Sequence, residues 1–111
     1  MLFRSYDNID IVAARERGIP VVNVPDYGTE EVADSALGMA LTLARGMHFL
    51  NSRLRRGIGA WNIEQAKPVH RLRGRVFGII GCGRIGSATA VRAKSFGFDV
   101  MIYDQIGRAH V

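Results

Sequence analysis

Three glycines and one aspartate in the 111-residue chain have the spacing of a phosphate-binding turn. Gly81, Gly83 and Gly86 follow the apolar run Val76–Ile80 in the pattern Gly-x-Gly-x-x-Gly. The first glycine allows a tight turn, the second lets a pyrophosphate approach the backbone, and the third lets a helix pack against the strand. Asp104 follows Gly81 by 23 residues, at the end of a second apolar run. An acid there is expected to accept hydrogen bonds from ribose hydroxyls.

This spacing predicts a dinucleotide site, and Asp104 favours NAD over NADP because its charge repels a 2′-phosphate. Arg84 adds positive charge beside the unpaired amides of the helix that follows. Two other interpretations stay open: a glycine turn that only joins a strand to a helix, and a strand-end acid without a ligand. Cys82, the only cysteine, excludes an internal disulfide. We interpret it as a small filler in the turn, with a redox role as the alternative.

The elements that must position the turn alternate between helix and strand. The sequence predicts a short helix over 10–17 that ends at Gly18, a strand over 21–24, a helix N-capped by Thr29, a helix over 47–57, a strand over 75–80, a helix over 84–96 and a strand over 99–103. We expect Phe49, Leu50 and Leu54 to be inside and Trp61 to anchor a turn. The last three elements predict a β-α-β unit with two parallel strands.

The helix that begins at Thr29 is predicted to be apolar nearly all round. Its apolar residues are Val32, Ala33, Ala36, Leu37, Met39, Ala40, Leu41, Leu43 and Ala44. A helix of this kind is buried on several sides. We therefore expect it to pack against a second domain, a partner subunit, or both.

Composition narrows the class of protein. Hydrophobic residues make up 48 % of the chain, which argues against disorder. No apolar run approaches the roughly 20 residues of a membrane span, and no signal peptide is predicted, so the expected location is cytoplasmic. The net charge is +5, and eight of the basic residues lie between Arg45 and Arg75. We expect a solvated surface there, with a nucleic-acid-binding patch as the alternative. No metal site is predicted.

Both ends of the chain look foreign to the rest. The last six residues, IGRAHV, match a translation of a sequencing-adapter string, and the first five, MLFRS, match its reverse complement. We expect residues 1–5 and 106–111 to be scars. The alternative is that both ends are natural and the chain is complete.

Several consecutive motifs carry a family resemblance. The stretches "YDNIDIVAARERGIPVVNVPDYGTEEVADSALGMALTLAR", "GAW" and "RLRGRVFGIIGCGRIGSATAVRAKSFGFDVMIYD" resemble the D-isomer-specific 2-hydroxyacid dehydrogenases. The subgroup around the C-terminal binding proteins is nearest, given "NVPDYGTEEVADSAL" and "RAKSFGFDV". Two departures are that the family usually has Gly-x-Gly at Phe3–Ser5 and proline at Gln105.

The resemblance implies an α/β fold, part of a doubly wound (Rossmann) NAD-binding domain with a remnant of the substrate domain. Residues 6–28 would be that remnant and 29–105 the first part of the NAD-binding domain. The apolar helix would be a long interdomain helix, with a homodimer formed through the region Thr29–Arg45. The implied cofactor-binding residues are Val32 beside the nicotinamide, Gly81, Cys82, Gly83, Arg84, Ile85 and Gly86 around the pyrophosphate, and Asp104 at the ribose.

The resemblance implies an NAD-dependent oxidoreductase that transfers hydride between NAD(H) and a 2-hydroxy or 2-keto acid. The family's catalytic Arg, Glu and His lie downstream of Asp104, so the chain alone is expected to be inactive. His48 and His70 do not match the motif of the catalytic histidine and are interpreted as surface and linker residues. The alternative function is an NAD-sensing scaffold or corepressor of the C-terminal binding protein type.

Overall fold

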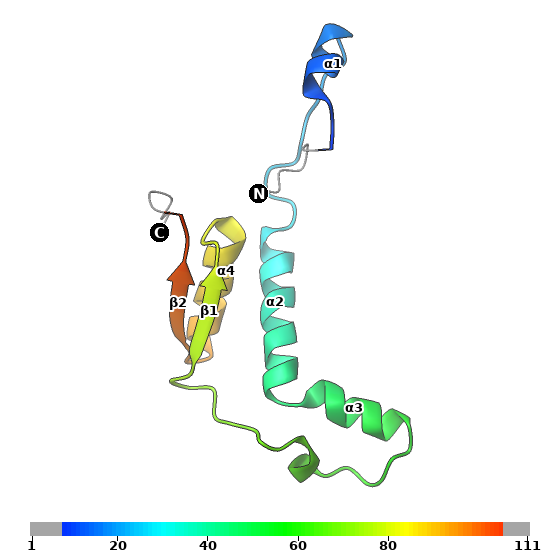
Figure 1. Cartoon of the computed structure of the whole chain (residues 1–111), viewed down its shortest axis with the longest axis vertical. Helices are drawn as coiled ribbons and strands as arrows, with labels where there is room; N and C mark the ends of the chain where they lie inside the picture. The colour runs from blue at the N-terminus through cyan, green and yellow to red at the C-terminus, as the bar shows by residue number, and fades with distance from the viewer. Residues whose placement is uncertain (1–7, 106–111) are drawn as a thin grey trace.

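The computed structural model describes residues 8–105 (Figure 1). The predicted scars at 1–5 and 106–111 therefore lie outside the described residues. In chain order the elements are α1 (Ile11–Glu16), α2 (Thr29–Ala44), α3 (Met47–Arg55), a 3-10 turn η1 (Ile63–Ala66), β1 (Val76–Ile80), α4 (Arg84–Ser95) and β2 (Asp99–Tyr103).

The β-α-β unit is present as predicted. Strands β1 and β2 pair in parallel, with Val76 opposite Asp99 and Ile80 opposite Tyr103, and α4 is the crossover between them. The parallel register brings the carboxyl ends of both strands to one edge, where the glycine turn begins. The helix 84–96 was predicted one residue too long, since α4 ends at Ser95 and Phe96 is its C-cap.

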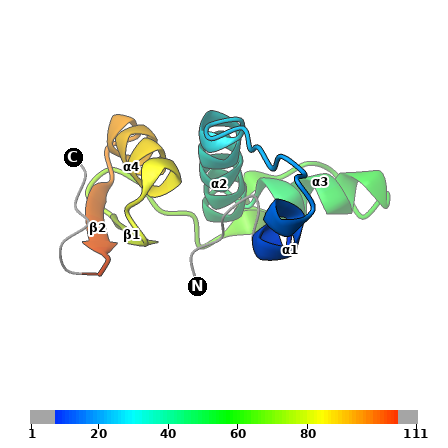
Figure 2. The ribbon, with the colours of Figure 1, turned by 90° about the horizontal axis from the view of Figure 1, so that it is seen from above.

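The core lies where α4 meets both the sheet and α2. Figures 1 and 2 show α4 beside the strands on one side and beside α2 on the other. Phe77 of β1 and Phe98 pack edge to face with ring centroids 5.3 Å apart. The cluster consists of buried Leu37, Ala93 and Phe98 with the partly buried Leu41, Leu72, Phe77 and Val100 around them. This packing holds the last turns of α4 against the second half of α2.

Helix α2 packs on one side only within the described residues. Ala33 and Leu37 are buried against α4, whereas Met39 and Leu43 are 63 % and 65 % exposed. The expected burial of this helix on several sides stays a prediction.

The N-cap of α2 was predicted wrongly: Gly28 occupies it, and Thr29 is the first helical residue. Among residues 8–105, no helix is both long and apolar enough to cross a membrane.

The segment before α2 differs from its prediction. Residues 21–24 are not a strand, and Val22 is 90 % exposed. A strand needs a neighbouring backbone to accept and donate its hydrogen bonds, and in the described part of the chain the only paired strands are β1 and β2. The short helix was predicted correctly: Asp10 caps α1 by accepting from the Ala13 amide at 2.9 Å, and Gly18 follows it with φ +66°.

The segment after α2 also packs less than expected. Leu50 of α3 is buried, but Phe49 and Leu54 are exposed, and Trp61 is 62 % exposed rather than an anchor. The main contact of α3 apart from α2 is the short turn η1, which is too small to cover a helix face. The chain is correspondingly extended, with a radius of gyration of 19.9 Å, whereas a compact domain of this length has about 13 Å.

Candidate dinucleotide-binding site

The glycine turn joins the end of β1 to the start of α4. Gly81 has φ +92°, a left-handed conformation that side chains rarely adopt. Its amide donates to the Tyr103 carbonyl at 2.8 Å, which holds the turn against the end of β2. The first glycine of the motif is therefore required by the backbone, as the sequence predicted.

The start of α4 exposes backbone donors. Gly83 is the N-cap, and no side chain of the described residues caps the helix there. The first bond within the helix runs from the Ser87 amide to the Gly83 carbonyl at 2.8 Å. The amides that precede Ser87 have no carbonyl within the helix to donate to. Together with the helix dipole, these donors suit an anion such as a phosphate.

The other two glycines differ in what a side chain would meet. A Cβ on Gly83 would have no described atom within 4 Å, so the backbone is bare to whatever approaches it. A Cβ on Gly86 would lie 2.0 Å from the Gly81 carbonyl oxygen and 3.5 Å from a methyl carbon of Ile79. Gly83 thus leaves room for a ligand and Gly86 allows helix and strand to approach. These are the two roles that a pyrophosphate-binding turn needs, and the residues present fit the cofactor.

A cleft of about 850 Å³ opens in front of this turn. This volume falls in the range of small-molecule sites, roughly 300–1,000 Å³. Its wall is formed by the segment 25–29, by Val32 and Ala36 of α2, by 77–80 of β1, and by Gly81, Gly83, Arg84, Ile85, Gly86 and Thr89. The predicted residues of the turn and Val32 therefore meet at one cleft. Cys82 and Asp104 do not line it.

Asp104 lies in direct contact with the turn. Its Oδ2 accepts a hydrogen bond from the Cys82 amide at 2.7 Å, and its Oδ1 accepts one from the Gln105 amide at 2.6 Å. The Sγ atom of Cys82 lies 3.4 Å from Oγ of Ser87 on α4. The predicted pair of turn and acid is thus brought together, and the carboxylate also stabilises the turn.

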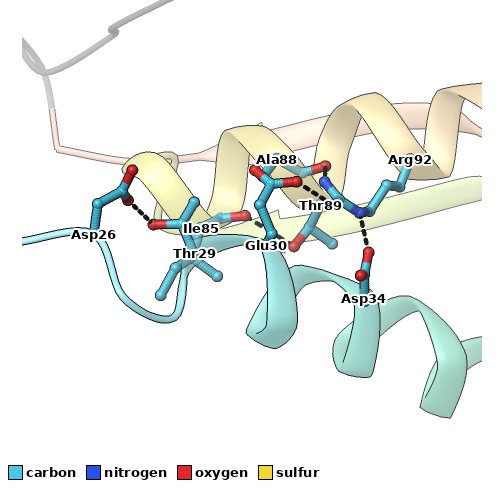
Figure 3. A network of polar contacts seen from close by, with 8 residues as sticks. All are labelled: Asp26, Thr29, Glu30, Asp34, Ile85, Ala88, Thr89 and Arg92. Atoms are coloured by element: carbon cyan, nitrogen blue, oxygen red, sulfur yellow. Dashed lines mark hydrogen bonds and ion pairs between the residues drawn. The ribbon is translucent and has the colours of Figure 1, made fainter.

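Two sets of polar contacts position α2, one at the cleft and one against α4, and the sequence did not reveal either. Asp26, which precedes α2, accepts a hydrogen bond from the Thr29 hydroxyl at 2.5 Å (Figure 3). The same Oδ1 atom lies 3.8 Å from Nη1 of Arg84. The signal available in the sequence was the Asp-x-x-Thr spacing before an apolar helix.

The second set is an ion-pair clamp between α2 and α4, formed by Arg92, Glu30 and Asp34 (Figure 3). Arg92 donates from Nε to Asp34 at 2.5 Å, from Nη2 to Glu30, and from Nη1 to the Ala88 carbonyl at 3.0 Å. Hydrogen bonds to Glu30 and then Asp34 raise the pKa of Arg92, although desolvation opposes them. Glu30 and Asp34 are four residues apart and so share one face of the helix, which was the only sequence signal for the clamp.

The chain is similar to curated proteins over most of its length but to only a small part of theirs. It is 42 % identical over 106 residues to C-terminal-binding protein 1 of Caenorhabditis elegans, covering 92 % of this chain and 15 % of that protein. It is 43 % identical over 98 residues to D-3-phosphoglycerate dehydrogenase of Haemophilus influenzae, covering 88 % of this chain and 23 % of that enzyme.

The fold is likewise similar to solved structures. The D-lactate dehydrogenase of Aquifex aeolicus, solved with NAD and lactic acid, superimposes with a TM-score of 0.71 at 32 % identity, over 93 % of this chain and 30 % of that one. The model of the D-isomer specific 2-hydroxyacid dehydrogenase NAD-binding domain matches residues 37–111. These matches confirm the α/β Rossmann fold class and NAD as the cofactor of this domain type. The chain belongs to the D-isomer-specific 2-hydroxyacid dehydrogenase family.

Proposed function

We propose that the chain is part of an NAD-dependent oxidoreductase that transfers hydride between NAD(H) and a 2-hydroxy or 2-keto acid. The observation that carries this proposal is the bare start of α4, where Gly83 offers open backbone to a cleft of about 850 Å³. Family membership supports the same cofactor, since the matching model is an NAD-binding domain.

The chain's own residues would bind and orient the cofactor. The pyrophosphate would lie on the α4 amides beside Gly81, Cys82, Gly83, Arg84, Ile85 and Gly86. Asp104 would accept hydrogen bonds from the ribose, and Val32 would lie beside the nicotinamide. When bound, NAD supplies hydride donor and acceptor chemistry, and the protein supplies position and electrostatics. The hydrogen bond from the Cys82 amide would keep the carboxylate beside the turn while it accepts from a sugar hydroxyl.

We assign no catalytic residue to this chain. The family's Arg, Glu and His would lie elsewhere in a longer protein, so this chain would bind cofactor without turning over substrate. Its coverage of 15 % and 23 % of the two curated relatives is in keeping with that. Residues 6–28 would belong to the substrate domain and residues 29–105 to the NAD-binding domain. The lone Cys82 suits a reducing, cytoplasmic location.

Helix α2 would be the interdomain helix, and the region Thr29–Arg45 would form a homodimer interface. Support comes from the apolar side chains that α4 leaves uncovered. Val32, Met39 and Leu43 are each about half exposed or more. A soluble protein tends to cover a contiguous apolar surface of this kind by association.

The basic segment 45–75 is better explained as ordinary surface than as a nucleic-acid site. Arg53 donates to the Gln65 side chain at 2.8 Å, and its guanidinium lies 5.7 Å from the centroid of the Phe49 ring. Arg45 donates to the His70 carbonyl at 3.2 Å. These contacts hold the segment after α3 against α3 and against the end of α2, and they engage two of the eight basic residues within the chain.

A scaffold or corepressor is the second candidate function, favoured by the 42 % identity to the C. elegans C-terminal-binding protein. The test is NADH oxidation by the full-length protein against a panel of 2-keto acids, with a Gly83→Val variant as the matched control. Turnover with wild type only would establish the dehydrogenase. Tight NADH binding without turnover on any 2-keto acid would favour the scaffold, and absence of NADH binding would contradict both.

A further inference from the structure

An acid lies at the edge of a cleft that we propose to bind an anion. Asp26 and Arg84 both line this cleft, and their side chains are 68 % and 66 % exposed. A carboxylate near the expected pyrophosphate weakens binding unless it has another role, because like charges repel. The position of Asp26 therefore requires an explanation.

One carboxylate oxygen connects the first residues of two helices. Oδ1 of Asp26 accepts from the hydroxyl of Thr29, the first residue of α2, at 2.5 Å. The same oxygen lies 3.8 Å from Nη1 of Arg84, the first residue of α4. The hydrogen bond from Thr29 restricts rotation of the Asp26 carboxylate. The carboxylate is therefore held in the position from which it pairs with Arg84.

The partner of Asp26 is also the first residue of α4, beside its bare amides. Arg84 directly follows the Gly83 N-cap, where the helix lacks a capping side chain among the described residues. An anion on those amides would compete with Asp26 for the same guanidinium, since its N–H groups can donate charge-assisted hydrogen bonds to the oxygens of either anion.

We propose that Asp26 is a positioning residue that acts as the resident counter-ion of Arg84 and is replaced there by the cofactor pyrophosphate. Asp26 then lowers NAD affinity while it keeps the guanidinium at the edge of the cleft. This inference rests on the proposed function. An exposed ion pair of this kind changes an equilibrium by only about 1.5- to 5-fold, so the expected effect on the dissociation constant is in that range.

The test measures NADH affinity of the full-length protein by calorimetry in wild type and four variants: Asp26→Asn, Glu31→Gln, Arg84→Ala and the double variant Asp26→Asn with Arg84→Ala. Asp26→Asn keeps an oxygen that accepts from Thr29 but removes the charge, and we expect it to tighten NADH binding about 1.5- to 5-fold at low salt. Glu31→Gln is the control, because it removes an exposed acid from the same helix start. It should leave affinity unchanged. Asp26→Asn in an Arg84→Ala background should bring no further tightening.

The outcomes separate this inference from the proposed function. If wild type does not bind NADH, the proposed function fails and the inference with it. If wild type binds but Asp26→Asn binds no more tightly than Glu31→Gln, the inference alone is overturned. Equal tightening in the presence and absence of the Arg84 side chain also overturns it, because the effect would then be general repulsion. Should Asp26→Asn fail to fold, as judged by circular dichroism, Asp26→Ser replaces it under the same criteria.

Discussion

Gly86 contacts Gly81 so closely that a Cβ on Gly86 would lie 2.0 Å from the Gly81 carbonyl oxygen. The close approach of the backbone at Gly81 and at Gly86 sets the angle between β1 and α4. It thereby also positions the unpaired amides at the start of α4. Even a single methyl group would force helix and strand apart, because backbone atoms cannot move aside as a flexible side chain can.

Gly86→Ala should therefore destabilise the full-length protein by about 1–3 kcal/mol, the usual cost of overpacking, and weaken NADH binding. Chemical denaturation and calorimetry measure the two effects. The control is Gly38→Ala, since a Cβ on Gly38 has no described atom within 4 Å and the position is helical. Stability equal to wild type in Gly86→Ala would contradict this packing.

Gly83→Ala should have the opposite profile. Its φ of −74° suits any residue, and a Cβ would meet no described atom within 4 Å. We expect a normal unfolding midpoint but NADH binding weakened by at least about tenfold, roughly 1.4 kcal/mol, because the Cβ would occupy space that the pyrophosphate needs. Normal affinity in a Gly83→Val protein would place the nucleotide elsewhere.

Asp104 has two separable contributions. Asp104→Ala removes the acceptor of the Cys82 amide and should lower stability by about 1–3 kcal/mol as well as NADH affinity. Asp104→Asn keeps an oxygen acceptor and should therefore be more stable than Asp104→Ala. Its preference for NADH over NADPH should fall, because the negative charge that repels a 2′-phosphate is gone. Comparing both cofactors by titration tests this. An unchanged preference in Asp104→Asn would argue against a ribose contact.

The clamp between α2 and α4 should contribute to stability in a coupled way. Arg92→Met should lower the melting temperature by a few degrees, and adding Asp34→Asn should lower it little further, since the partner is already lost. Arg92→Lys is the conservative control. Additive shifts would show that the contacts act independently.

The pH dependence of the clamp follows from the direction of the shift. Because Glu30 and Asp34 raise the pKa of Arg92 above its usual value, this stabilisation is present below that value and is lost only as the pH rises through the raised pKa. Titration of Arg92 should therefore not weaken the clamp near neutral pH.

Helix α2 should cause association when the 111-residue chain is expressed alone. Exposed Met39 and Leu43 favour dimers or aggregates in sedimentation. Met39→Lys with Leu43→Lys should shift the distribution toward monomer, whereas Ser35→Lys on the same helix should not. A soluble, cooperative monomer of the unmodified chain would contradict the interface that we propose.

The reliable sequence predictions were those with a local cause. The tight turn at Gly81, the end of the first helix at Gly18 and the strand-end position of Asp104 all follow from a few neighbouring residues. By contrast, a strand at 21–24 needs a neighbouring strand, and Trp61 needs a surface to pack against. The described residues provide neither, and both Val22 and Trp61 are exposed. Hydrophobic composition predicts that a residue tends to be covered but does not say by what.

The polar contacts of the site were missed for a related reason. Asp34 and Arg92 are 58 residues apart, and Asp26 and Arg84 belong to different elements. Single-sequence periodicity does not pair charges over such separations. The family resemblance supplied the roles of the turn and of Val32, but the clamp and the Asp26–Arg84 pair emerge only once the helices are placed together.

The sequence separation within the clamp also affects how the chain is made. At a ribosomal rate of about 5–20 residues per second, the 58 residues between Asp34 and Arg92 take roughly 3–12 seconds to synthesise. During that interval α2 has been translated but its partner helix has not. Until α4 has been synthesised, the nascent chain therefore also exposes Ala33 and Leu37, which α4 covers in the folded chain, so α2 is most prone to aggregate during this interval.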